Sequence, residues 1–165
     1  MEYPERKQIR LPAYDYSAPG AYFVTVCTQG RRCILSDIVV GADALGGPSV
    51  HLSDLGRIVE KYLLSTDRID GLRVDKYVIM PNHVHMILFI EKADGPPRAS
   101  APTGALIPNA IGAWKRLIHR EAGQRVFQRS YHDHVIRCES DYREIWEYVD
   151  NNPAKWAEDR YYTEG

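Results

Sequence analysis

Cysteine is scarce in this sequence, and long apolar runs are absent. The 165 residues include three cysteines, Cys27, Cys33 and Cys138, and no two of them have C-x-x-C spacing. A small, odd number of this kind argues against a disulfide framework and against a zinc knuckle, so we expect reduced thiols. No apolar run approaches the roughly 20 residues that a membrane-spanning helix needs. We therefore expect no membrane partner.

A large excess of charge of either sign is also lacking. The sequence holds 21 Lys and Arg against 22 Asp and Glu, a formal net charge of −1. This balance argues against a protein that coats nucleic acid without selectivity, but it does not exclude a local basic face. The first ten residues are charged and polar, without the apolar core of a secretion signal, so we expect a cytoplasmic protein.

Length and composition predict a single domain over residues 1–165. Hydrophobic residues make up 44% of the chain and charged residues 26%, as in ordinary globular proteins. Residues 1–20 have the composition of an extended N-terminal arm. Residues 93–104, rich in Pro, Gly, Ser and Ala, predict a flexible loop.

The hydrophobic pattern predicts an alternation of strands and helices. Strands are expected over residues 21–28, 33–40, 50–52, 72–80, 84–90 and 131–137. Helices are expected over residues 54–65, 108–122 and 141–150, with a short helical tail to 159. We expect Ser53 or Asp54 to cap the first helix and Ser140 to cap the last. This order predicts an α+β fold with one antiparallel sheet and helices on one face.

Two histidines in the segment Pro81-Asn82-His83-Val84-His85 are the most informative feature of the sequence. Residues i and i+2 of a strand project from the same face, so the two imidazoles can bind one divalent ion while Val84 faces the core. Two histidines on the solvated face of a strand, without any ligand, give the same pattern. Taken alone, the pair favours this second interpretation.

Tyr148 is a tyrosine of the last predicted helix. It lies near the apolar stripe of the last predicted helix, where a core position and a functional position fit equally well. Asn152 follows four residues later, so the two side chains share one face if the helix continues that far. Tyr142 lies on the same helix but has no polar residue four places on, before the proline.

Three separated blocks of the sequence together resemble a known family. The segment YVIMPNHVHMIL resembles the signature strand of the HUH single-tyrosine transposases. The blocks RLPAYDYSAPGAYFVTVCT and DYREIWEYVDNNPAKW are similar to the REP-associated tyrosine transposases, a branch of that superfamily. The resemblance covers residues 9–156. It implies a ferredoxin-like (RRM-like) antiparallel sheet with a C-terminal helix that bears the tyrosine.

The resemblance implies a role for each matching residue. His83 and His85 match the paired metal ligands, Tyr148 matches the nucleophile, and Asn152 matches the third metal ligand, where relatives often carry glutamine. The implied cofactor is Mg²⁺ or Mn²⁺, and by ligand type alone Mn²⁺ or Zn²⁺ fits as well. Attack by the tyrosine would leave a 5′-phosphotyrosine intermediate and a free 3′-OH, from which the strand can be rejoined without ATP.

The implied partner is single-stranded DNA at imperfect palindromic hairpins of the REP type, in the nucleoid of a bacterium. Basic residues beside aromatic ones suit such a substrate, because cations follow phosphates and rings stack on unpaired bases. The candidates for DNA contact are Arg6, Lys7, Arg10, Tyr14, Tyr16, Arg31, Arg32, Lys115 and Arg116. Trp114 directly precedes Lys115 and Arg116, and for this residue a core position is the stronger interpretation. The sequence leaves open a monomer or a homodimer.

A second His-x-His pair, His132 and His134, has no assigned metal role. For His134 a second-shell contact to the metal site and a hydrogen-bonded strand edge are equally good interpretations. The leading prediction is a metal-dependent single-stranded DNA endonuclease and strand transferase. The alternatives are a catalytically inactive hairpin-binding regulatory protein, an unrelated metallohydrolase that uses His83 and His85, and a nuclease of the replication-initiator or relaxase kind.

Overall fold

The computed structural model describes residues 18–39, 47–91 and 106–163. The expected flexible loop and nearly all of the expected N-terminal arm lie outside these residues. So do five of the candidate DNA contacts, namely Arg6, Lys7, Arg10, Tyr14 and Tyr16. None of the helices in the described part is long and apolar enough to cross a membrane.

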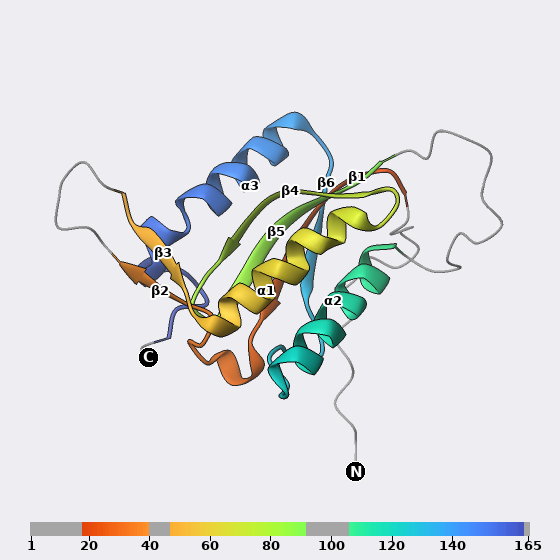
Figure 1. Cartoon of the computed structure of the whole chain (residues 1–165). Coiled ribbons are helices and arrows are strands. Elements are labelled where there is room, and N and C mark those ends of the chain that lie inside the picture. Colours follow the sequence, from red (N-terminus) through yellow and green to blue (C-terminus); the bar gives the residue numbers. More distant parts are fainter. Residues whose placement is uncertain (1–17, 40–46, 92–105, 164–165) are drawn as a thin grey trace, which may run out of the picture.

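Four antiparallel strands form the main sheet, in the order β4-β5-β1-β6 (Figure 1). Their bounds are Leu72–Ile79 for β4, His83–Ile90 for β5, Gly20–Cys27 for β1 and His132–Ile136 for β6. A separate two-stranded sheet pairs β2 (Ser36–Val39) with β3 (Ser49–Leu52). Each strand lies within two or three residues of a predicted one, because β-branched and aromatic residues mark them clearly.

The helices of the described residues also follow the predicted pattern. The α-helices are α1 (Asp54–Ser65), α2 (Leu106–Ala122) and α3 (Glu139–Asn151), and the 3-10 helices are η1 (Gln29–Arg31), η2 (Thr66–Arg68) and η3 (Pro153–Glu158). Ser53 caps α1, because its Oγ accepts a hydrogen bond from the Gly56 N–H at 3.0 Å. The prediction that Ser140 caps α3 is wrong. The extended residue before the helix is Cys138, so Ser140 already lies inside the first turn.

Two layers of helices enclose the sheet, with α1 and α2 on one face and α3 on the other (Figure 1). Along β1 and β5 the even-numbered side chains, such as Val24 and Met86, join the hydrophobic core with Val59 of α1 and Trp114 of α2. The order β1-α1-β4-β5-α2-β6 is the split βαβ arrangement of ferredoxin-like folds. The predicted fold class is therefore confirmed, with two differences: α3 covers the face opposite α1 and α2, and β2 and β3 form a second, small sheet.

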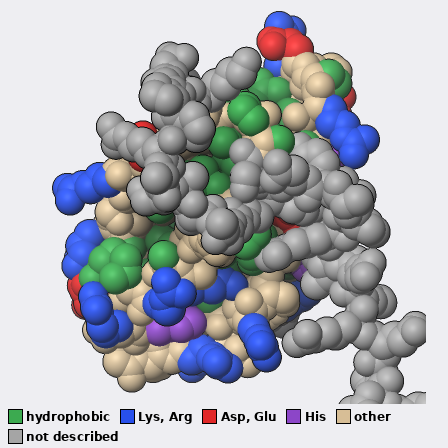
Figure 2. All heavy atoms as spheres, turned by 90° about the vertical axis from the view of Figure 1, so that its right-hand side faces the viewer, with side chains coloured by type: hydrophobic (Ala, Val, Ile, Leu, Met, Phe, Trp, Pro, Cys, Tyr) green, Lys and Arg blue, Asp and Glu red, His purple; other side chains and the backbone are tan. Residues whose placement is uncertain are grey.

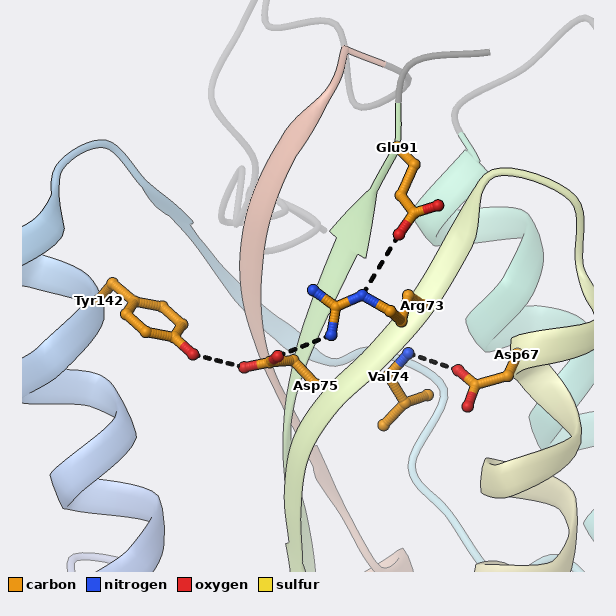
Figure 3. Close-up of polar contacts among 6 residues, drawn as sticks. All are labelled: Asp67, Arg73, Val74, Asp75, Glu91 and Tyr142. Atoms are coloured by element: carbon orange, nitrogen blue, oxygen red, sulfur yellow. Dashed lines mark hydrogen bonds and ion pairs between the residues drawn. The ribbon is translucent and has the colours of Figure 1, made fainter. Parts of the chain in front are cut away.

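Polar contacts attach the first turn of α3 to β4 (Figure 3). The register of β4 shifts between Val74 and Lys76, and the carboxylate of the residue between them, Asp75, lies against α3. Asp75 accepts hydrogen bonds from the Tyr142 hydroxyl at 2.6 Å and from the Arg73 guanidinium at 2.8 Å. This anchor gives Tyr142 a structural role and orients the rest of α3 along the sheet.

Candidate active site

The two histidines lie at the beginning of β5, on the face of the sheet that α3 covers. His83 is 0% exposed and His85 is 1% exposed. Their side chains point the same way, as predicted for positions i and i+2, and their Nε2 atoms lie 3.0 Å apart. On the neighbouring strand β1, Thr25 is paired with His85 and Cys27 with His83.

Hydrogen bonds determine which ring nitrogen of His83 carries the proton. The Asn82 side chain is oriented by its amide nitrogen, which donates to the Tyr161 carbonyl at 2.7 Å. Its Oδ1 can therefore only accept, and it lies 2.8 Å from His83 Nδ1. His83 Nδ1 must then donate, so the lone pair of the neutral ring lies on Nε2, which accepts the hydrogen bond from His85 Nε2 at 3.0 Å. The Nδ1 atom of His85 is hydrogen-bonded to the Thr25 hydroxyl at 2.8 Å, so its Nε2 also faces inward.

Burial keeps both imidazoles neutral. It lowers the pKa of His83 to about 4, although the nearby Asp159 carboxylate acts in the opposite direction. Burial also lowers the pKa of His85 well below its ordinary value, and the neighbouring His83 adds to this shift. A neutral imidazole with a lone pair on Nε2 is the form that binds a metal ion.

Tyr148 lies over the histidine pair from α3. Its ring packs against His85, with 5.2 Å between ring centroids, and against Phe23 of β1, with 6.1 Å. The side chain is 41% exposed, which excludes the interpretation of Tyr148 as a fully buried core residue. Burial, followed by the charge of Asp159, raises the pKa of the phenol to about 12. Tyr148 is therefore protonated at neutral pH and needs activation before it can attack.

Asp159, which follows η3, completes a group of possible metal ligands. One ligand atom from each of His83, His85 and Asp159 lies within 4.8 Å of the others. Asp159 Oδ2 also accepts a hydrogen bond from the Tyr148 hydroxyl at 3.4 Å and one from the Asn152 amide nitrogen at 2.7 Å. One carboxylate thus contacts the candidate nucleophile and lies near the histidine pair.

Sequence reasoning missed Asp159. It is separated from His85 by more than 70 residues, and no spacing in the sequence connects the two. The chain brings it back because η3 turns after Pro153 and Tyr161 then packs into the site. Tyr161 is buried, its ring centroid lies 4.8 Å from that of His83, and its N–H donates to Asp159 Oδ1 at 2.6 Å.

Asn152 lies one helical turn after Tyr148, in the position that the resemblance assigns to a third ligand. Its backbone is still helical, so the two side chains share a face of α3, as expected. The side chain is 3% exposed, and its Oδ1 atom makes no well-formed hydrogen bond within the described residues. The side chain does lie close enough to His83 to raise the pKa of that ring. Its role as a ligand stays a prediction.

These groups fit a divalent metal ion. A buried amide oxygen without a well-formed hydrogen bond is costly unless a ligand satisfies it, and Asn152 Oδ1 is such an atom within the part of the chain that the structure describes. Metal-binding histidines usually hydrogen-bond through the second ring nitrogen, as His83 and His85 do here. The His83, His85 and Asp159 group could therefore bind a metal. Mixed imidazole and carboxylate ligands are compatible with Mn²⁺, Fe²⁺ or Zn²⁺, while Mg²⁺ prefers oxygen alone.

A cavity of about 520 Å³ opens beside the tyrosine. Its wall includes Tyr148, Asn152, Asp159, Lys155 and Arg160. The candidate nucleophile and Asp159 therefore lie on the wall of this cavity, whereas the buried His83 and His85 do not line it.

The candidate DNA contacts within the described residues are exposed, except for one lysine. Arg31 and Arg32 of the η1 segment and Arg116 of α2 are exposed. Lys115 is 8% exposed, and its ammonium group donates to the backbone carbonyls of Gln128, Arg129 and Ser130. Lys115 thus holds the segment before β6, and we remove it from the candidate DNA contacts.

Two further side chains have roles in the fold. Trp114 is buried against Phe127, which confirms its interpretation as a core residue. His134 Nε2 lies 2.9 Å from the Asp141 carboxylate of α3. Among the described residues no contact joins His134 to His83 or His85, so its second-shell role has no support.

Comparison with known proteins gives a relative and a fold. No family model matches the chain. A protein of Haemophilus influenzae (strain ATCC 51907 / DSM 11121 / KW20 / Rd), named only as an uncharacterized protein, is 30% identical over 178 residues. The match covers 96% of this chain and 94% of the relative.

The solved structure of a REP-associated tyrosine transposase bound to a REP hairpin has a similar fold. The TM-score is 0.61 at 20% sequence identity, over 88% of this chain and 73% of that one. A candidate transposase from Deinococcus radiodurans reaches a TM-score of 0.42, which is too low to add to the argument. The chain therefore belongs to the same family as the Haemophilus influenzae protein, and it has the fold of a REP-associated tyrosine transposase, as its sequence predicted.

Proposed function

We propose that this protein is a transposase-like enzyme: a metal-dependent endonuclease and strand transferase for single-stranded DNA. Tyr148 is its nucleophile, and His83, His85 and Asp159 are its metal ligands, with Asn152 as a further candidate ligand. One observation carries the proposal. The Tyr148 hydroxyl is hydrogen-bonded to Asp159, the same carboxylate whose oxygen lies within 4.8 Å of the two histidine nitrogens.

The chemistry follows from this arrangement. A phenol whose pKa is raised to about 12 is a poor nucleophile by itself. A divalent ion bound by the histidines would polarise the scissile phosphate and stabilise the charge that develops on it. Asp159 and the His85 ring orient the Tyr148 hydroxyl. Attack on phosphorus forms the Tyr148–phosphate bond, breaks the bond to the 3′ oxygen and leaves a free 3′-OH.

Exposed cations on another part of the molecule support a nucleic-acid substrate. The arginines Arg116, Arg120, Arg125 and Arg129 are exposed on α2 and the segment that follows it. Figure 2 shows Lys and Arg side chains gathered on the side of the molecule that includes this region. With a net charge of only −1, the chain as a whole does not attract DNA. A DNA-binding protein of this composition therefore needs a local basic surface such as this one.

We propose hairpins with single-stranded flanks as the substrate, in line with the structural relative, which was solved with a REP hairpin. The inactive regulatory alternative is not favoured, because it gives no role to the clustering of Tyr148, Asp159 and the two histidines. An unrelated metallohydrolase would use the histidines but would leave Tyr148 without a function.

The ends of the cleavage products test this function against hydrolysis. A panel of hairpin oligonucleotides from repeats of the source genome, labelled at the 5′ or the 3′ end, is incubated with protein and Mn²⁺ and then digested with or without protease. We expect a 5′ fragment with an extendable 3′-OH and a 3′ fragment that migrates freely only after protease digestion. A metallohydrolase would release two protein-free fragments, and that result would refute the transferase.

A further inference from the structure

Arg160 lies on the wall of the cavity beside Tyr148, next in sequence to Asp159. Much of the remaining wall is acidic, because it includes Glu144, Glu147 and Glu158. A phosphate group that enters this cavity to reach Tyr148 therefore meets several negative charges. A cation on the wall is needed to offset this repulsion, and among the described residues that line the cavity Arg160 and Lys155 are basic.

The Arg160 guanidinium is held in place by Tyr161. Its central carbon lies 4.6 Å from the centroid of the Tyr161 ring, and one of its nitrogens donates a hydrogen bond to the Tyr161 hydroxyl. Tyr161 is itself fixed, because it is buried and its ring contacts that of His83 at 4.8 Å. Arg160 is thus oriented by a residue that packs directly on the candidate metal site.

Most of the donors of Arg160 are uncommitted. A guanidinium carries five N–H donors in a planar fork. Within the described residues, Arg160 uses its fork for the single hydrogen bond to Tyr161 and forms no ion pair. Arg160 lines the same cavity as Tyr148 and Asp159, so its free donors lie on the wall that a phosphate must pass to reach Tyr148.

We propose that Arg160 is a catalytic residue that binds a non-bridging oxygen of the scissile phosphate. The inference rests on the proposed function and adds the Arg160 guanidinium, on the cavity wall, to the groups that act on the scissile phosphate. In the step, the Tyr148 oxygen bonds to phosphorus, and the 3′ oxygen leaves with the electrons of the broken bond. The phenol loses one proton and the 3′ oxygen gains one, while Arg160 remains protonated and stabilises the negative charge on the phosphate oxygens.

Substitution of Arg160 separates this role from a structural one. Arg160→Met retains the aliphatic stem over Tyr161 and removes the charge, and Arg160→Lys restores a charge without the fork. Arg143→Met is the matched control, because Arg143 is an exposed arginine of α3 whose partner is Glu139. Each variant is compared with the full-length wild type in single-turnover adduct formation at saturating protein with Mn²⁺, together with the melting temperature and hairpin affinity.

The comparison is made on two oligonucleotides, one natural and one with a neutral methylphosphonate at the linkage that the wild type cleaves. On the natural strand we expect Arg160→Met to react about 10²- to 10³-fold more slowly, as when an oxyanion-stabilising donor is removed, with partial recovery in Arg160→Lys. On the neutral linkage the wild type and Arg160→Met should react at similar rates. Arg143→Met should match the wild type on both.

Two results would overturn the inference. One is an unchanged rate for Arg160→Met on the natural strand, and the other is an equal loss on both linkages, since loss through misfolding does not depend on the charge of the phosphate. If the wild type forms no adduct with any hairpin and metal, the proposed function itself fails. If instead the wild type and Arg160→Met react equally well, the proposed function stands and only the role of Arg160 is refuted.

Discussion

The hydroxyl of Thr25 and the Nδ1 atom of His85 lie 2.8 Å apart, across directly paired residues of β1 and β5. Thr25 is buried, so water cannot replace it. We predict that Thr25→Val, which preserves shape but removes the hydroxyl, weakens Mn²⁺ binding by about 10- to 100-fold, as second-shell changes do in other metal sites. Electron paramagnetic resonance of free Mn²⁺ measures the affinity. Thr25→Ser is the control and should bind nearly as tightly as the wild type, whereas equal affinity in Thr25→Val would remove Thr25 from the site.

Most of the fold could be predicted from the sequence, because its local signals agree. Pro81 and Asn82 separate β4 from β5 where predicted, since proline lacks a donor for the sheet and the two residues form the turn. The cap at Ser53 could also be predicted, because a hydroxyl side chain immediately precedes an amphipathic helix. Ser140 gave the same local signal but lies two residues after the N-cap position, Cys138, because the helix already begins at Glu139.

The site was only partly predictable. His83, His85, Tyr148 and Asn152 could be named because the blocks that contain them resemble a known family, whereas their local patterns alone also fitted residues without a function. Asp159, Tyr161 and Arg160 could not be, because the return of the chain after Pro153 is a tertiary feature without periodicity. The burial of Lys115 was missed for a related reason, since its partners are backbone carbonyls that no sequence pattern reveals.

Two substitutions distinguish the candidates for the third metal ligand. We predict that Asp159→Asn, which keeps the shape of the side chain but removes its charge, weakens Mn²⁺ binding by at least about tenfold, because affinity follows the charge of the ligands. Asn152→Ala should have a smaller effect, since it removes a neutral oxygen. Isothermal titration with MnCl₂ measures both variants. A larger loss in Asn152→Ala than in Asp159→Asn would make the asparagine the principal third ligand.

The anchor between Tyr142 and Asp75 should make stability depend on alkaline pH. The hydrogen bond to Asp75, followed by burial, raises the pKa of Tyr142 to about 12 in the folded state, above about 10 in the unfolded chain. The folded state therefore binds more protons between these values, so the contribution is complete below pH 10 and is lost as pH rises toward 12. We predict that Tyr142→Phe costs about 1 kcal/mol at pH 8, the scale of a hydrogen bond near the surface.

Urea unfolding of the wild type and of Tyr142→Phe at pH 8 and pH 11 tests whether the contribution of Tyr142 to stability falls as pH rises. The difference in free energy of unfolding between wild type and Tyr142→Phe should shrink at pH 11. Tyr77, whose pKa is also raised to about 12 by burial and by Glu60, contributes equally to both proteins and cancels in the comparison. A difference that grows with pH would contradict the assignment.

The exposed arginines of α2 should contribute to DNA affinity and not to chemistry. We predict that Arg116→Gln combined with Arg120→Gln lowers the slope of log affinity against log salt by one to two, about one per lost phosphate contact. The rate of adduct formation at saturating protein should not change. Fluorescence anisotropy with a labelled hairpin over a range of NaCl concentrations measures the slope. Arg57→Gln, on α1, is the control, and a salt slope unchanged in the double variant would remove α2 from the DNA surface.

The central claim is that Tyr148 becomes covalently joined to DNA, and a denaturing gel tests it most directly. Labelled hairpin oligonucleotides are incubated with Mn²⁺ and with wild type, Tyr148→Phe or Tyr142→Phe. Tyr148→Phe keeps a ring against His85 and Phe23, and Tyr142→Phe is the matched control on the same helix. We predict an adduct that requires metal, forms in wild type and in Tyr142→Phe, and is absent in Tyr148→Phe. An adduct that persists in Tyr148→Phe, or bound hairpins that give no adduct with any divalent metal, would contradict the account.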